Sequence, residues 1–205
     1  LIRSKMFAVW FARRTVFVLI NYLRNGKVRR YKYVHLMFND KFNRPFSDFL
    51  SRHFNVNEHL VICERILRHP MPTGMNVMKA WTFRGFDFSS ASIKKVFCHS
   101  LCENELVDIL MAHQEVLHKA YWIIWGGDLY NAPRDAKNDF VRSHFGGWVT
   151  VADGDACVAE KIYGKENIVS AVMHADELNV AMTEKYGKPV YHYHLHIHNL
   201  LYMGQ

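Results

Sequence analysis

The chain has 205 residues, of which 50% are hydrophobic and 22% are charged, a composition typical of a globular protein with one sizeable core. These proportions exclude a disordered, collagenous or small disulfide-stapled protein. The net charge of +7 is unevenly spread, because residues 1–32 hold nine basic side chains and no acidic one, which leaves −2 on the rest. A nearly neutral body gives no electrostatic argument for nucleic acid as a partner, and we predict none.

Residues 1–30 are basic and aromatic, and we expect them to form a leader outside the main domain. Their apolar side chains would occur on every side of a helix, which makes a poor amphipathic stripe. Two interpretations stay open: an arm that lies on anionic lipid, and an upstream segment that takes no part in the fold. No run of about 18 uncharged apolar residues exists, so we expect no membrane span. Four cysteines without a CxxC pair predict reduced thiols in a cytosolic protein.

From residue 31 onward, strand and helix patterns alternate along the chain. Short apolar runs bounded by turn residues predict strands, and apolar residues at three- and four-residue spacing predict helices. The predicted strands are 32–38, 58–63, 77–83, 92–99, 120–125, 147–152 and 167–172. The predicted helices are 45–53, 103–118, 133–145, 153–163 and 175–186. This alternation predicts an α/β fold, with an open, parallel, Rossmann-like sheet and flanking helices.

Open parallel sheets bind ligands at the carboxyl ends of their strands, and this rule selects the candidate site residues. Asn39 and Asp40 follow the first predicted strand, and His99 ends the fourth. Residues 126–128 follow the fifth strand, and residues 153–155 follow the sixth. His99 is a candidate base or hydrogen-bond donor, and a neutral histidine bonded to a loop carbonyl fits the same position.

The most unusual stretch of the sequence is WIIWGGDLY at residues 122–130. Gly126 and Gly127 allow a sharp turn and a close approach of the backbone to a ligand. Asp128 lies between Trp125 and Tyr130, which suits a saccharide, because a carboxylate binds hydroxyls while an aromatic face covers the ring. Asp128 is also a candidate general base. An aspartate that closes a turn by accepting backbone amides fits the same pattern, so both interpretations stay open.

Two other patterns resemble metal sites. Asp153 and Asp155 have the spacing with which two carboxylates share a divalent cation, but both also fit the capped start of a helix, which we favour. The four alternating histidines of His192–His198 would share one face of a strand. They fit a zinc or nickel site, or an exposed edge or linker. No glycine-rich nucleotide motif is present, and we predict neither a cofactor nor a resident metal.

Several segments together resemble one enzyme family. KVFCHSL at 95–101 and WIIWGGDLY at 122–130 resemble the TDP-N-acetylfucosamine:lipid II N-acetylfucosaminyltransferases, the 4-alpha-L-fucosyltransferases of glycosyltransferase family 56. YVHLMFNDKF at 33–42 and VADGD at 151–155 are similar to that family's first strand and a later helix start. The resemblance covers about residues 31–205 and implies the N-terminal, acceptor-side lobe of a two-domain GT-B enzyme. It implies a Rossmann-like acceptor-side domain at 31–190, followed at 191–205 by a linker and the first strand of a truncated donor domain.

The resemblance also implies an activity. The family transfers an N-acetylfucosamine-type sugar from a TDP-sugar to a lipid-linked saccharide, as in the synthesis of enterobacterial common antigen, peripherally on the cytoplasmic face of the bacterial inner membrane. By analogy Asp128 is the expected catalytic residue, and His99 is the second candidate. The residues expected to bind the acceptor are Trp125, Gly126, Gly127, Tyr130, Asn39, Asp40 and Asp155. Since the donor site would lie mostly in the missing half, we expect this fragment to be inactive alone. The alternatives are a non-catalytic α/β binding module and a membrane-associated basic protein.

Overall fold

The computed structural model describes most of the first 170 residues. The described residues are 2–39, 43–64, 69, 74–80, 82–102, 104–131, 133–150, 153–164 and 168–170. The predicted helix at 175–186, the candidate Asp40, the His192–His198 tract and the predicted domain boundary at 190 lie outside them.

Seven strands form one open sheet in the order β3-β2-β1-β4-β5-β6-β7. Every neighbouring pair is parallel, which confirms the predicted α/β, Rossmann-like class. The strands are β1 (Tyr33–Phe38), β2 (His59–Glu64), β3 (Val77–Ala80), β4 (Lys95–His99), β5 (Ala120–Ile124), β6 (Gly147–Thr150) and β7 (Ile168–Ser170). The chain builds outward from β1 in one direction, then returns to place β4 on its other side. The gap between β1 and β4 is therefore the topological switch point of the sheet.

Apart from α1, which was not predicted, the helices follow the predicted alternation with two differences. They are α1 (Ile2–Val28), α2 (Asn43–His53), α3 (Asn104–Ala112), α4 (Gly127–Tyr130), α5 (Ala136–Ser143) and α6 (Asp153–Tyr163), with 3-10 turns η1 (Val56–Glu58) and η2 (Gln114–Lys119). The helix expected over 103–118 is divided, because the backbone of His113 leaves the helical region (φ −127°, ψ 57°). The single turn α4 was not predicted.

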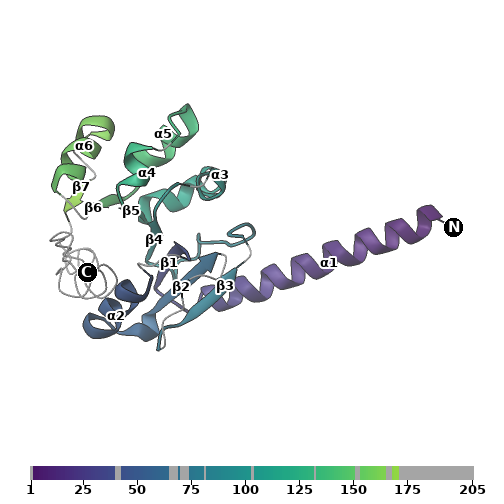
Figure 1. The fold of residues 1–205 in the computed structure, drawn as a ribbon. Coiled ribbons are helices and arrows are strands. Elements are labelled where there is room, and N and C mark those ends of the chain that lie inside the picture. Colours follow the sequence, from purple (N-terminus) through teal and green to yellow (C-terminus); the bar gives the residue numbers. More distant parts are fainter. Residues whose placement is uncertain are drawn as a thin grey trace.

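Both faces of the sheet are buried, as expected for parallel strands covered by crossover helices. Alternate residues such as Leu36, Ile62 and Trp122 pack in a large apolar cluster with residues of α3 and α5. The residues between them, such as Met37 and Ile123, face the opposite side and pack with residues of α2. Figure 1 shows α2 apart from the group formed by α3, α5 and α6.

Helix α1 extends far from the sheet, but its last turns belong to the core. Val28 is completely buried, and the Arg24 guanidinium donates to the carbonyl oxygen of Thr82. The Asn25 amide donates to the carbonyl oxygen of Gly85 (3.0 Å), and its oxygen accepts from the backbone N–H of Asp87 (2.9 Å). The final turns of the segment that the sequence assigned to a leader therefore pack on the domain.

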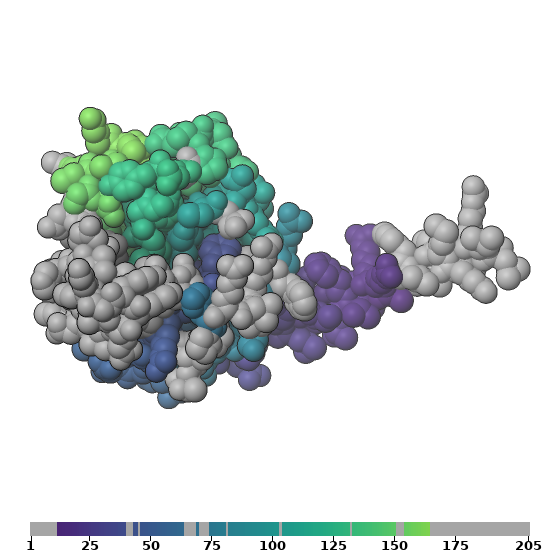
Figure 2. Space-filling view, in the orientation of Figure 1, coloured from purple at the N-terminus to yellow at the C-terminus, as the bar shows by residue number. Residues whose placement is uncertain are grey.

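The preceding part of α1 projects away from the domain (Figures 1 and 2). A helix of 27 residues is about 40 Å long. Its large apolar side chains from Val16 to Leu23 are between 46% and 74% exposed, among them Val16, Phe17, Val18, Leu19, Ile20, Tyr22 and Leu23. Among the described residues, no helix combines the length and apolarity needed to cross a membrane.

Candidate functional site

The candidate residues converge at the carboxyl edge of the sheet, beside the switch point. His99 is the last residue of β4, and Trp125 follows β5, the next strand along the sheet. The two rings stack with their centroids 6.4 Å apart. Asn39 follows β1 on the other side of β4, so three neighbouring strands deliver predicted residues to this edge.

Asp128 is the structural centre of this edge. Its side chain is completely buried, and its oxygens accept three hydrogen bonds. The backbone N–H of Leu101 (3.0 Å) and the indole N–H of Trp122 (2.6 Å) donate to Oδ2, and the backbone N–H of Trp125 (2.9 Å) donates to Oδ1. Burial raises the pKa of Asp128, and these three donors oppose that shift. One carboxylate thus joins the segment after β4 to the turn after β5.

This geometry corrects the expected role of Asp128. A general base needs a lone pair that is available to a substrate proton, and both Asp128 oxygens already accept hydrogen bonds from protein donors. Of the two interpretations that the sequence left open, the structure supports an aspartate that closes the turn. Asp128 acts through the residues whose backbone it fixes, which leaves His99 as the candidate base.

The backbone directly after His99 is held in an unusual conformation. Ser100 has a φ of +69°, a left-handed value that costs a serine about 1 kcal/mol. Its N–H donates to the carbonyl oxygen of Ile123 (3.0 Å), and the Arg142 guanidinium donates to the carbonyl oxygen of Leu101 (3.1 Å). Strain of this kind persists where surrounding contacts over-determine it, and it concentrates at functional sites.

The turn after β5 presents an aromatic and polar surface. Gly126 has a φ of +86°, a conformation open to glycine at little cost, and it is the N-cap after which α4 begins at Gly127. Tyr130 is 57% exposed, and its hydroxyl donates to Asp155 Oδ1 (2.7 Å), which raises the pKa of Tyr130. We call His99, Trp125, Tyr130 and Asp155 the carboxyl-edge site.

The other predicted residues have different positions. Gly127 is exposed in the first turn of α4. The Asn39 side chain pairs with the backbone of His69, donating to its carbonyl oxygen (3.0 Å) and accepting from its N–H (3.1 Å). Asn39 therefore joins the segments that follow β1 and β2. In the part of the chain that the structure describes, no three His, Cys, Asp or Glu side chains are arranged to hold a metal ion.

The structure contains a row of three buried histidines that the sequence did not predict. They lie on the face of the sheet that α2 covers. His35 Nδ1 lies 3.2 Å from His99 Nε2, and His35 Nε2 lies 3.0 Å from His59 Nδ1. All three side chains are at most 3% exposed. We call His59, His35 and His99 the histidine chain.

Burial keeps the histidine chain neutral at ordinary pH. It lowers the pKa of His99 to about 3 and that of His59 to about 4, the latter against an opposing effect of Glu58. It lowers the pKa of His35 well below its usual range, and the other two histidines add to this shift. A sequence signal for His35 did exist, because it interrupts the buried apolar run of β1.

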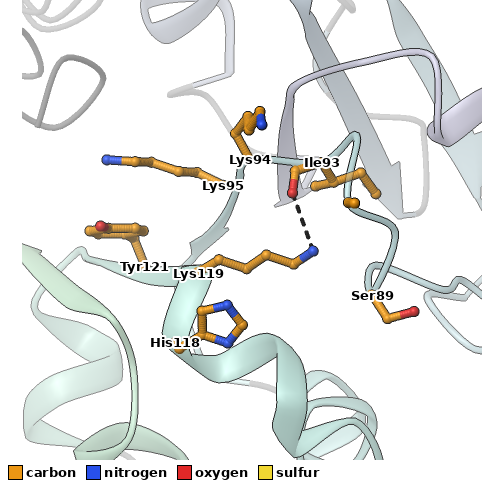
Figure 3. Close-up of a pocket in the computed structure, with 8 residues that line it drawn as sticks. Ser89, Ile93, Lys94, Lys95, His118, Lys119 and Tyr121 are labelled. Carbon is orange, nitrogen blue, oxygen red and sulfur yellow. Dashed lines mark hydrogen bonds between the residues drawn. The ribbon is translucent and has the colours of Figure 1, made fainter. Parts of the chain in front are cut away.

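A separate pocket of about 430 Å³ lies at the opposite, amino-terminal edge of the sheet (Figure 3). Its lining includes Lys95, Lys119 and Tyr121, and burial lowers the pKa of both lysines. The ammonium of Lys119 donates to the carbonyl oxygens of Ser90 (2.9 Å) and Ile93 (3.2 Å), so it holds the pocket wall together. None of the predicted site residues lines this pocket.

Comparison with known protein families, curated proteins and solved structures found no match for this chain.

We predict that Asp128→Asn destabilises the protein. The substitution places an amide N–H against groups that are themselves donors, which leaves at least one buried N–H without an acceptor. The free energy of unfolding should fall by about 2–3 kcal/mol in urea denaturation. Asp48→Asn is the control, because the Asp48 side chain on α2 is 46% exposed and forms a 3.9 Å surface pair with Arg44. A change of about 0.5 kcal/mol or less is expected there, and an equally small effect of Asp128→Asn would contradict its anchoring role.

We also predict that stability falls steeply as pH drops below about 6.5. In that range the unfolded chain protonates its histidines, while His99 stays neutral in the folded chain down to about pH 3 and His59 to about pH 4. The unfolded state therefore binds more protons, and each buried histidine contributes a slope of about 1.4 kcal/mol per pH unit. The slope between pH 5 and 6 should be smaller by about that amount in His99→Gln than in the wild type. Equal slopes in the variant and the wild type would show that His99 is not held neutral.

Proposed function

We propose that this chain is the acceptor-side lobe of a glycosyltransferase that moves an N-acetylfucosamine-type sugar from a TDP-sugar to a lipid-linked saccharide. The proposal combines the resemblance of the segments at 95–101 and 122–130 with the place where the fold puts them. The first segment contains the carboxyl end of β4, which borders the switch point, and the second contains the carboxyl end of β5, the next strand. Open parallel sheets bind ligands at this edge. In this proposal a donor lobe outside the described residues supplies the nucleotide site.

The carboxyl-edge site is the observation that carries the proposal. It brings an imidazole (His99) beside an indole face (Trp125). In the turn that follows, the Asp155 carboxylate lies beside Gly126 and accepts a hydrogen bond from the Tyr130 hydroxyl. An aromatic face with adjacent hydroxyl and carboxylate groups matches the apolar and hydroxyl-bearing surfaces of a sugar ring. The turn that carries Trp125 is held at both ends, through Asp128 and the left-handed Gly126.

We assign the role of general base to His99. Acceptor attack requires removal of a hydroxyl proton, and a neutral imidazole nitrogen accepts such a proton. Nδ1 of His99 is buried and has no hydrogen-bond partner among the described residues, so it keeps capacity for a ligand. Asp128 fixes Leu101, two residues after His99, and thereby positions the base.

We further propose that α1 attaches the protein to an anionic membrane surface, as its substrate would require. The exposed apolar residues from Val16 to Leu23 follow Arg13 and Arg14, and no described acidic residue occurs in this helix. Apolar side chains that enter the interface, together with basic groups near anionic lipid, are the two components of reversible interfacial binding.

The proposed activity is tested by turnover of the full-length protein with TDP-N-acetylfucosamine and a lipid-linked saccharide. We expect His99→Gln to lower kcat by about a hundredfold or more, because the base is lost. Trp125→Ala should mainly raise KM, since it removes a binding surface and leaves the base in place. His118→Gln is the matched control and should retain wild-type turnover.

The same experiment separates the alternatives. Wild-type turnover in His99→Gln would refute the assigned base, and Asp155 would then be the next carboxyl-edge residue to replace. Binding of the saccharide without any transfer would favour a non-catalytic α/β binding module. Absence of both binding and transfer would refute the proposed function.

The membrane proposal predicts that the full chain sediments with vesicles containing phosphatidylglycerol and that binding weakens as salt increases. Replacing Val16, Phe17 and Leu19 by serine should reduce the bound fraction at least tenfold, because about 0.8 kcal/mol is lost per buried methylene group. Ile162→Ser on α6 is the control, since Ile162 is 38% exposed but distant along the chain. Equal binding by the triple variant and the wild type would refute the role of α1.

A further inference from the structure

The histidine chain crosses the sheet diagonally beneath α2. His59 lies opposite Tyr33 in the first position of β2, and His35 stands two residues beyond Tyr33 on β1. His35 lies opposite Phe97, and His99 stands two residues beyond Phe97 on β4. Each step therefore moves one strand across and two residues along. At about 3.3 Å per residue, the three backbone positions advance about 13 Å along the strand direction, from the amino end toward the carboxyl end of the sheet.

The histidine chain packs among aromatic side chains. The Phe46 ring of α2 packs edge-on against His35 (5.2 Å between centroids) and against His99 (4.4 Å). Phe97 stacks on His35 at 4.8 Å, and Tyr33 stacks on His59 at 4.8 Å. The imidazoles consequently exchange hydrogen bonds with one another in a low-dielectric environment, where such bonds are strong and reinforce one another.

The two hydrogen bonds restrict the protonation of all three rings together. A neutral imidazole carries one N–H, so each bond needs a donor on one ring and a lone pair on the next. If His35 donates through Nδ1, then His99 carries its proton on Nδ1, and His59 must donate through Nδ1. If His35 donates through Nε2, then His99 donates through Nε2, and His59 carries its proton on Nε2. The neutral chain thus has two states, in which all three protons lie on Nδ1 or all three lie on Nε2.

The two states differ at the end that faces the carboxyl edge. Nδ1 of His99 is buried and has no hydrogen-bond partner among the described residues. In the all-Nε2 state this atom is a lone pair that accepts a proton, and in the all-Nδ1 state it is a donor. A buried polar atom without a partner costs about 1–3 kcal/mol, which a ligand hydroxyl bonded to Nδ1 would offset.

We propose that the histidine chain is a proton relay that carries the proton of an acceptor hydroxyl from the carboxyl-edge site to the opposite end of the sheet. The hydroxyl proton moves to His99 Nδ1 as the His99 Nε2 proton moves to His35 Nδ1. The His35 Nε2 proton moves to His59 Nδ1, and the His59 Nε2 proton leaves to water. One proton enters and one leaves, and the three rings change from the all-Nε2 to the all-Nδ1 state. His35 and His59 are thereby positioning residues for the base.

The relay resolves a difficulty in the assignment of His99. Burial makes a lone imidazolium at this position unfavourable, which is why the pKa of His99 lies at about 3. A base that kept the proton would be weak at neutral pH. Passing a proton onward leaves every ring neutral, so the dry environment that opposes a fixed charge does not oppose the transfer. The relay rests on the proposed function only for the identity of the hydroxyl.

Tautomers give a direct test that needs no substrate. Long-range ¹H–¹⁵N NMR spectra of the histidine-labelled full chain at pH 7 should show His35, His59 and His99 neutral and sharing one tautomer, or exchanging between both states together. His59→Asn places a side-chain amide near the position of Nδ1 and should change the tautomer ratio of His99 two strands away. His53→Asn, in an exposed histidine of α2, should leave the ratio unchanged. Different tautomers among the three rings of the histidine chain, or a charged imidazole at any of them, would overturn the relay.

Turnover of the full-length protein supplies the second test. We expect His59→Asn to lower kcat at least tenfold and leave KM unchanged, since His59 touches no substrate, whereas His53→Asn should behave as wild type. Wild-type kcat in His59→Asn would overturn the relay and leave the transferase intact. If the wild-type protein transfers no sugar, the proposed function fails, and the tautomers alone then decide the relay: the relay stands if His59→Asn shifts the ratio at His99 and falls if it does not.

Discussion

The arrangement of the carboxyl edge depends on the buried carboxylate of Asp128. Its three donors come from the segment after β4, from β5 itself and from the turn after β5. Leu101 precedes Asp128 by 27 residues in the chain, and this one side chain fixes the relative positions of all three donors. The strained Ser100 and the left-handed Gly126 lie on the two segments that Asp128 joins. The residue that the sequence offered as a candidate general base is thus the reason why its neighbours hold their positions.

The two faces of the sheet serve different purposes. The face that packs against α3 and α5 is filled by large apolar side chains such as Trp122, Trp148 and Phe145. The face beneath α2 is also closed, but it accommodates three imidazoles whose polar atoms bond mainly to one another. Buried polar groups normally need partners, and a row of side chains with matching spacing satisfies that need without water. The exception at the end of the row, Nδ1 of His99, lies where the candidate site is.

The sequence predicts the secondary structure well because its signals are local. Short apolar runs such as AYWII and the turn glycines after them fix the strands, and the alternation of strands and helices predicts the parallel sheet. The site is less predictable, because its decisive contacts are distant in the sequence. Whether Asp128 meets a substrate or a backbone N–H depends on Leu101, and the role of His35 depends on rings 24 and 64 residues away. The docking of the last turns of α1 is hidden for the same reason, since the partners of Arg24 and Asn25 follow β3.

The order of the strands has a consequence for synthesis on the ribosome. Because β1 is central, β2 and β3 can assemble on one side of it before β4 has been translated. The last turns of α1 must wait for the loop that contains Gly85 and Asp87, although this helix emerges before any of the seven strands. During that interval the apolar side chains of α1 have no folded domain to pack against. A nascent chain of this protein therefore exposes an apolar helix to chaperones or lipid before its sheet has formed.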